Sequence, residues 1–177
     1  MWASVIANLS ARHVAAFQLA GPATHAAESE SERRFHQKVQ ELPEPELEVF
    51  DTGHLVQVKE LIRDGLLDDP VMIQLCMGIA YGAPDDPNTF MAMVNNLPRD
   101  CVFSAFSISR MQIPFAAQSV LAGGNVRVGL EDNLYAGPGQ LATNAMLVEK
   151  ARTLLETMGV RLMSPQAVRD KLKLVKR

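Results

Sequence analysis

The sequence predicts an α/β fold built from parallel strand–helix repeats, beginning at Glu46. Short runs rich in apolar and β-branched residues recur at intervals of roughly 24 to 30 residues, the length of one strand–helix unit. A loop that contains Gly or Pro and then an amphipathic stretch follows each run. Elements that alternate in this rhythm form a parallel sheet with helices packed against it. The four runs are Glu46–Phe50, Val71–Met77, Cys101–Ser107 and Asn125–Leu130.

Start and stop signals place helices between and after these runs. Leu55, Val58 and Ile62 line one face of a helix over residues 53–63, which Gly65 ends. Further helices are expected over residues 87–97, 114–121, 139–158 and 165–172. The first and last of these begin with a proline that directly follows a capping residue. The repeats alone fit either half of a barrel or a small doubly wound sheet.

The overall composition excludes several classes of function. The chain has 177 residues and a net charge of −3, which does not favour a nucleic-acid partner. No apolar run reaches the roughly 18 to 20 residues that cross a bilayer, so no membrane partner is expected. Cys76 and Cys101 lie in apolar runs, and two buried free thiols suit a cytoplasmic location.

Residues 1–45 form an atypical N-terminal segment with a different pattern. Val5–Leu9 fits a strand and Glu28–Leu42 a solvated helix, while Pro43 and Pro45 make a stiff entry into the first repeat. Residues 46–177 hold the four strand–helix units and the C-terminal helices.

The fourth run places polar groups on one side of a strand. Arg127, Gly129 and Glu131 alternate with apolar residues, so they face the sheet interior while the apolar residues face the helices. Buried charges need a partner, a ligand or a metal ion. One interpretation is a structural ion pair between Arg127 and Glu131. The other is that Glu131 binds a cation while Arg127 pairs with a neighbouring carboxylate. Asp132 follows at the start of the loop.

Polar and glycine residues follow every strand run, where the active sites of parallel α/β proteins lie. Earlier in the chain, Glu46 and Glu48 project to the same side of the first run, and a solvated edge strand explains that pattern alone. The four histidines show neither H-x-H nor H-x-x-x-H spacing, so each is expected to be structural or exposed.

These residues resemble a known family. The run NVRVGLEDNLY after Gly123-Gly124 is similar to GGHVRVGLEDNLY, a signature of the β-keto acid cleavage enzymes, which include 3-keto-5-aminohexanoate cleavage enzyme. MGIAYGAP resembles the family's LGVPGGAP, and SISRMQIP resembles GIGRxQLP. The resemblance also takes in PELEVFDTGH, covers about residues 36–177, and implies the last four strands of a zinc-dependent (β/α)8 TIM barrel. Since such a barrel needs about 250 residues, the barrel is expected to be incomplete.

The resemblance implies a reversible Claisen-type exchange. A β-keto acid reacts with acetyl-CoA to give acetoacetate and a new acyl-CoA, while zinc polarises the keto oxygen. Carried over by position, Glu131 is the metal ligand, Asp132 and Arg127 form the acid–base dyad, and Glu48 acts near the reaction centre. Substrate-binding positions on the strand-end loops are Gly78, Gly82, Ser107 and Arg110.

Departures from the family pattern alter these expectations. The H-x-H pair that completes the zinc site does not occur in the sequence, so Zn²⁺ is expected to bind weakly or not at all. Tyr81, Ser107 and Ser109 replace glycines, and Asn125 replaces the signature histidine.

Three hypotheses follow: an enzyme part that needs a complementing barrel half, a non-catalytic truncated remnant or interaction subunit, or a small α/β module that binds an anionic metabolite. An isolated half barrel is expected to leave unpaired edges near Glu48 and Val128, with Val5–Leu9 covering one at most. Self-association into a homo-oligomer, or instability, is expected from those edges and from the exposed apolar interior.

Overall fold

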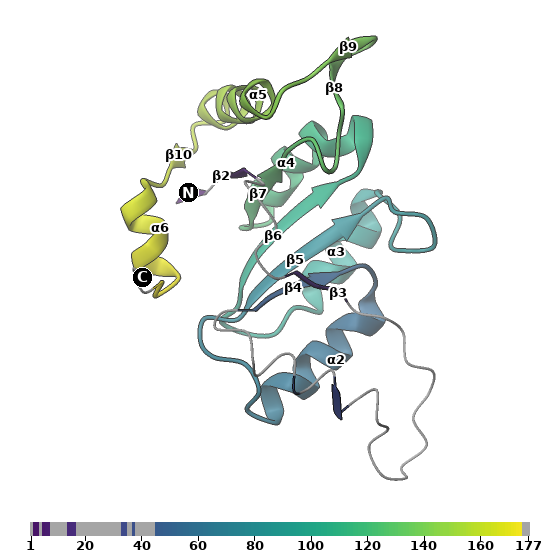
Figure 1. Ribbon diagram of the computed structural model, residues 1–177, viewed down its shortest axis with the longest axis vertical. Helices are drawn as coiled ribbons and strands as arrows, with labels where there is room; N and C mark the ends of the chain where they lie inside the picture. The colour runs from purple at the N-terminus through teal and green to yellow at the C-terminus, as the bar shows by residue number, and fades with distance from the viewer. Residues whose placement is uncertain are drawn as a thin grey trace.

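A computed structural model describes residues 2–3, 5–7, 14–16, 33–34, 37 and 45–174. Its main sheet has six parallel strands in the spatial order β2-β7-β6-β5-β4-β3 (Figure 1). The four runs expected from the sequence form the centre of this sheet, each shorter by one or two residues, which confirms the predicted parallel arrangement. These strands are β4 (Glu46–Val49), β5 (Met72–Met77), β6 (Val102–Ser107) and β7 (Asn125–Val128).

Four of the helices that connect and follow the strands begin at capping side chains, whereas the helix over Gln112–Leu121 has no side-chain cap. Asp51, Asp86, Thr143 and Ser164 each accept a hydrogen bond from a backbone N–H in the first turn of the helix that follows. Within the described residues, no helix has the length and apolar character to cross a membrane. The helices are α2 (Thr52–Arg63), α3 (Pro87–Asn95), α4 (Gln112–Leu121) after the 3-10 turn η1 (Ser109–Met111), α5 (Asn144–Thr157) and α6 (Pro165–Lys171).

The helix expected over residues 139–158 begins five residues later than the sequence suggested. A hairpin of β8 (Tyr135–Gly137) and β9 (Gln140–Leu141) occupies the preceding stretch and projects beyond the sheet in Figure 1. Gly139, with a φ of 70°, forms the turn between its strands. The helix therefore starts only after the Thr143 cap, and its expected start was wrong.

Both edges of the four-strand core carry a short strand from the N-terminal segment. β2 (Val5–Ala7) pairs with β7 as far as Val128, and β3 (Val14–Ala16) pairs with β4 as far as Glu48. The expectation that at least one of these edges is unpaired was wrong, because two separate pieces of the segment satisfy the edge N–H and C=O groups.

Other expectations for the N-terminal segment fall mostly outside the described residues. Of the helix expected over Glu28–Leu42, only Arg33, Arg34 and Gln37 are described, and they are helical and exposed. The first described strand, β1 (Trp2–Ala3), pairs with β10 (Arg161–Leu162) rather than with the main sheet.

Apolar side chains on the outer face of the sheet form two clusters beneath the helices. One cluster joins β4 and β5 to α2 and α3, and the other joins β7 to α4 and α5. Because side chains alternate along a strand, burying one set outward directs the intervening set toward the inner face. The buried outward residues on the strands include Leu47, Val49, Ile73, Leu75, Val126 and Val128.

Candidate active site at the inner face of the sheet

A row of polar side chains crosses the inner face. Glu48 on β4 lies opposite Gln74 on β5, which lies opposite Ser104 on β6, which in turn lies opposite Asn125 on β7. Arg127 is two residues beyond Asn125 and so faces the same side. The inward direction predicted for Arg127 from the alternation of β7 is the direction found.

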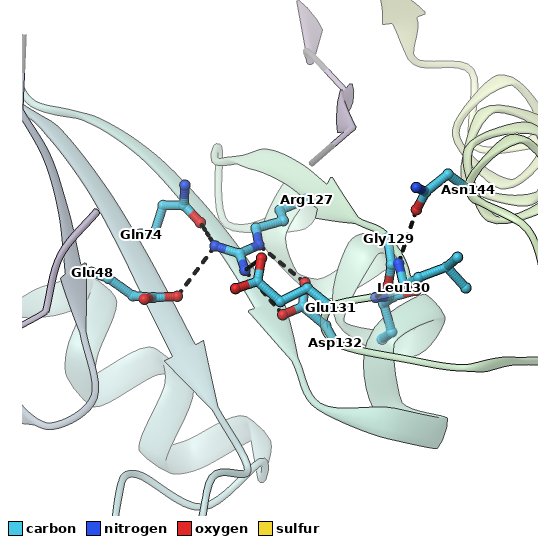
Figure 2. A network of polar contacts seen from close by, with 9 residues as sticks. Glu48, Gln74, Arg127, Gly129, Leu130, Glu131, Asp132 and Asn144 are labelled. Carbon is cyan, nitrogen blue, oxygen red and sulfur yellow. Dashed lines mark hydrogen bonds and ion pairs between the residues drawn. The ribbon is translucent and has the colours of Figure 1, made fainter. Parts of the chain in front are cut away.

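Arg127 is the centre of the polar network shown in Figure 2. Its Nε and Nη2 donate to the two carboxylate oxygens of Asp132, both at 3.0 Å. Nη2 also donates to Glu131 at 3.0 Å, while Nη1 donates to Gln74 at 2.8 Å and to Glu48 at 3.2 Å. A guanidinium has five N–H donors, and these contacts use all of them. The arginine is therefore fixed in one orientation.

The contact between Glu48 and Arg127 indicates that the sheet is curved. The two residues lie on β4 and β7, three strand spacings apart, which is roughly 14 Å along a flat sheet. Nevertheless Nη1 of Arg127 is 3.2 Å from a carboxylate oxygen of Glu48. This short distance fits a sheet that bends toward its inner face, as the strands of a barrel do.

An aromatic ring supports the guanidinium from one side. The central carbon of the Arg127 guanidinium lies 4.1 Å from the centre of the Phe106 ring, a cation–π arrangement. Sequence reasoning identified neither Phe106 nor Gln74 as part of the site. The available signal for Gln74 was its position as the one amide in the otherwise apolar run Met72–Met77.

Burial opposes ionisation of the carboxyl groups around Arg127. Burial raises the pKa of Asp132 and of Glu48, and the charge of Arg127 offsets part of the rise in each. The side chain of Glu131 is 63% exposed, whereas that of Asp132 is 3% exposed. The network thus has two enclosed carboxyl groups and one that faces solvent.

A fourth carboxyl group, Glu46, gives the unfolding equilibrium a measurable pH dependence. Burial raises its pKa above 4.5, with partial offsets from a hydrogen bond to Gln74 and from the charge of Arg127. The folded chain therefore holds this proton more tightly than the unfolded chain. The associated stability is present below pH 4.5 and is lost as pH rises through the raised pKa.

Replacing Glu46 with glutamine is expected to flatten this dependence. The amide cannot ionise, so the slope of unfolding free energy against pH just above 4.5 should change by up to about 1.4 kcal/mol per pH unit. Urea unfolding between pH 4 and 7 measures the slope. Glu149→Gln, at an exposed position on α5, is the control, and equal slopes in both variants would contradict the assignment to Glu46.

The proposed substrate loops converge beside this network. Gly78 has a φ of 77°, and a Cβ there would lie 2.9 Å from the Ser107 hydroxyl oxygen, which in turn donates to Asp85. At Gly82 a Cβ would lie 2.5 Å from the Ile79 side chain. Neither position has room for a larger residue, so the backbone passes close to its neighbours there.

Two substituted positions in these loops keep a left-handed backbone. Tyr81 and Ser109 have φ values of 65° and 61°, a conformation that favours glycine, and both stand where the family signature has glycine. The Tyr81 side chain is fully exposed, and the Ser109 N–H donates to the backbone oxygen of Asp132 at 2.6 Å. Arg110, the next residue, is exposed, and among the described residues it has no ion-pair partner.

Two side-chain amides hold the loop that carries the carboxylates. Nε2 of Gln112 donates to the backbone oxygen of Gly129 at 3.0 Å, and Oδ1 of Asn144 accepts from the N–H of Leu130 at 2.9 Å (Figure 2). The loop is therefore fixed from α4 and from α5 immediately before Glu131.

The described residues do not make up a zinc site. No group of three or more His, Cys, Asp or Glu side chains among them is arranged to hold a metal ion. His54 is buried, its Nδ1 accepts from the N–H of Phe50, and burial lowers its pKa. Both cysteines are free, but only Cys76 is buried as expected, whereas Cys101 is partly buried. Burial raises the pKa of Cys76 to about 12, which disfavours the thiolate form that binds metals. Glu131 alone is an insufficient donor set for zinc.

Comparison with known proteins decides the family. The model of the beta-keto acid cleavage enzyme family matches residues 5–174. The chain belongs to this family. A solved structure described as a ternary complex of ObcA with a C4-CoA adduct and oxalate superposes with a TM-score of 0.68 at 20% identity, covering 80% of this chain and 40% of that one. The fold is thus the C-terminal half of a β-keto acid cleavage enzyme barrel.

Curated members of the family match this chain over part of their length. 3-Dehydrocarnitine:acetyl-CoA trimethylamine transferase of Rhizobium meliloti is 65% identical over 133 residues, which are 75% of this chain and 44% of that protein. 3-Keto-5-aminohexanoate cleavage enzyme of Acetoanaerobium sticklandii is 32% identical over 127 residues, 71% of this chain and 46% of the enzyme. The chain spans less than half the length of these relatives.

Proposed function

We propose that this chain carries the acid–base part of a β-keto acid cleavage site. The observation that supports this is the two-pronged contact between Arg127 and Asp132, enclosed on a concave sheet with Glu48 on the other side of the arginine. The proposed reaction joins the carboxymethyl carbon of a β-keto acid to the acetyl group of acetyl-CoA. The bond from that carbon to the keto carbon breaks, the CoA thiolate takes the remaining acyl group, and acetoacetate is released.

Asp132 is the proposed proton-transfer group. Cleavage and formation of carbon–carbon bonds next to a carbonyl require a proton to be taken up and returned at the reacting carbon. Burial raises the pKa of Asp132 toward the range where a carboxyl group does both, while the paired N–H groups of Arg127 keep its oxygens in one orientation. We assign Glu48 to the same reaction centre from the opposite side.

Arg127 orients the carboxyl groups and does not bind the substrate. Its five N–H donors are all engaged within the chain, so a substrate carboxylate would have to displace an existing partner. Arg110 is the better candidate for that carboxylate, because it is exposed and adjoins Ser109, whose N–H contacts the backbone of Asp132. The loops at Gly78, Gly82 and Ser107 provide the remaining proposed substrate contacts.

The preferred substrate class is a β-keto acid with a cationic group. Three carboxyl groups surround the single guanidinium of Arg127, so the site carries an excess of negative charge when they are ionised. The Rhizobium meliloti relative acts on 3-dehydrocarnitine, as its name states, and a trimethylammonium group complements such a site. We therefore propose 3-dehydrocarnitine as the first substrate to test, with acetyl-CoA as the second.

Completion of the site requires another barrel half. Glu131 is the proposed metal ligand in this chain, and an H-x-H pair would come from outside these 177 residues, because a homo-oligomer of them adds none. Free Cys76 and Cys101 support a cytoplasmic location for the assembly. The alternative is a non-catalytic interaction subunit, which the lack of a three-ligand cluster among the described residues favours.

A fragment-complementation assay distinguishes the catalytic proposal from the non-catalytic interaction subunit. The purified chain is mixed with the amino-terminal part of the Rhizobium meliloti relative that precedes its matching region, in the presence of zinc, acetyl-CoA and 3-dehydrocarnitine. We expect acetoacetate only when both parts are present, since each lacks groups that the other supplies. A co-purifying pair that forms no acetoacetate would overturn the catalytic proposal and leave the interaction subunit.

A further inference from the structure

We propose that Gln74 is a positioning residue that sets the orientation of the Arg127–Asp132 dyad. The significance of this role for catalysis rests on the proposed function, whereas the geometry itself does not. Gln74 lies at the centre of β5, its exposure is 3%, and it stands between Glu48 on β4 and Ser104 on β6.

The amide of Gln74 has a defined direction. Its Oε1 accepts from Nη1 of Arg127 at 2.8 Å, shorter than the other four contacts that the guanidinium makes. Its side chain also hydrogen-bonds to Glu46, and a carboxylate accepts from the amide nitrogen. Gln74 thus connects the half-buried carboxyl group at the start of β4 to the arginine at the proposed reaction centre.

The neutrality of the amide explains why this position suits glutamine. Three carboxyl groups already surround Arg127, and a fourth would add repulsion without a further cation. Nη1 carries two N–H groups, one bonded to Gln74 and the other to Glu48. An apolar side chain at position 74 would therefore leave one of these buried N–H groups without an acceptor. Glutamine meets the geometric need at no cost in charge.

Loss of this acceptor should disturb Asp132 through the arginine. With Gln74 absent, Nη1 gains from moving closer to Glu48, and the rigid guanidinium turns as a unit. That rotation lengthens the Nε and Nη2 contacts with Asp132 on the opposite side. The readout is the hydrogen exchange of the Nε–H of Arg127, which is slow only while that donor stays bonded and enclosed.

Nuclear magnetic resonance of the full chain without substrate measures this exchange. Gln74→Met keeps the size and removes the acceptor, and we expect exchange about tenfold faster, as for loss of about 1.4 kcal/mol from a bond to a charged group. Ser104→Ala is the matched control: it is the next residue in the same row, and its hydroxyl has no partner among the described residues. Its exchange should stay within about twofold of wild type.

A second variant keeps the test decisive if Gln74→Met does not fold. Gln74→Glu retains an oxygen acceptor toward Nη1, so the exchange should stay within about threefold of wild type. Three results would overturn the positioning role. The first is unchanged exchange in Gln74→Met. The others are exchange in Gln74→Glu or in Ser104→Ala that is accelerated as much as in Gln74→Met. Because the measurement uses no substrate, such a result is separate from failure of the complementation assay.

Discussion

Replacing Arg127 with methionine should lower the free energy of unfolding by about 3–5 kcal/mol, the range found when one partner of a buried ion pair is removed. The substitution leaves Asp132 and Glu48 enclosed with no cation between them, and their mutual repulsion is no longer offset. Urea unfolding at pH 7 measures the change. Since small domains have total stabilities of about 5–15 kcal/mol, this loss is a large fraction of the whole.

The matched control is Arg152→Met on α5. Arg152 also contacts two carboxylates, Glu149 and Glu156, but its side chain is 52% exposed, and solvent-exposed ion pairs contribute little to stability. Arg127→Lys should fall between the two because it keeps the charge and loses the two-pronged geometry. Similar losses for Arg127→Met and Arg152→Met would contradict the assignment of Arg127 to an enclosed network.

Asp132→Asn should reduce acetoacetate formation by about 10²–10⁴-fold in the complemented pair, the usual range for a lost general acid–base group. The amide keeps the shape of the side chain and cannot take up the proton. The fall should appear in kcat more than in KM, since Asp132 is assigned to the chemical step rather than to substrate binding.

Two comparisons show whether this loss is chemical. Glu149→Gln lies on the exposed surface of α5 and should leave the rate unchanged. The unfolding free energy of Asp132→Asn should fall less than that of Arg127→Met, because the remaining carboxyl groups keep their cation. If the asparagine variant retained more than about a tenth of the wild-type rate, another group would have to carry the proton.

The inner face of β7 was predictable because alternation is a strong signal in a buried strand. Val126 and Val128 had to meet the helices, so Arg127 had to face inward, and the nearest carboxyl groups in the sequence were two of its partners. The family resemblance placed Glu48 near the reaction centre but did not predict its contact with Arg127, and on pattern alone its strand suggested a solvated edge.

Partners on other strands were harder to foresee. Gln74 reaches Arg127 only because the register of β5 against β6, and of β6 against β7, brings the two residues together, and a sequence does not state register. Phe106 gave no signal at all, since an aromatic residue in a buried strand is ordinary core.

The two main errors in the fold have the same origin. The β8–β9 hairpin and the short edge strands β2 and β3 are held by backbone hydrogen bonds, which depend little on side-chain type. A pattern of apolar residues therefore missed the hairpin and β3, whereas β2 lies within the strand expected over Val5–Leu9. Self-association, which was expected from open edges at β4 and β7, stays a prediction: β2 and β3 pair with those edges and are themselves the outer strands of the sheet.

A double-mutant cycle between Glu48 and Arg127 tests the central claim, which is that β4 to β7 curve into a barrel wall around one enclosed arginine. Unfolding free energies are measured for Glu48→Met, Arg127→Met and the double variant. A curved wall predicts a coupling of at least about 1 kcal/mol, because the two side chains are in direct contact. Effects that add to within about 0.3 kcal/mol would mean that the residues are apart, as on a flat sheet, and would contradict the account.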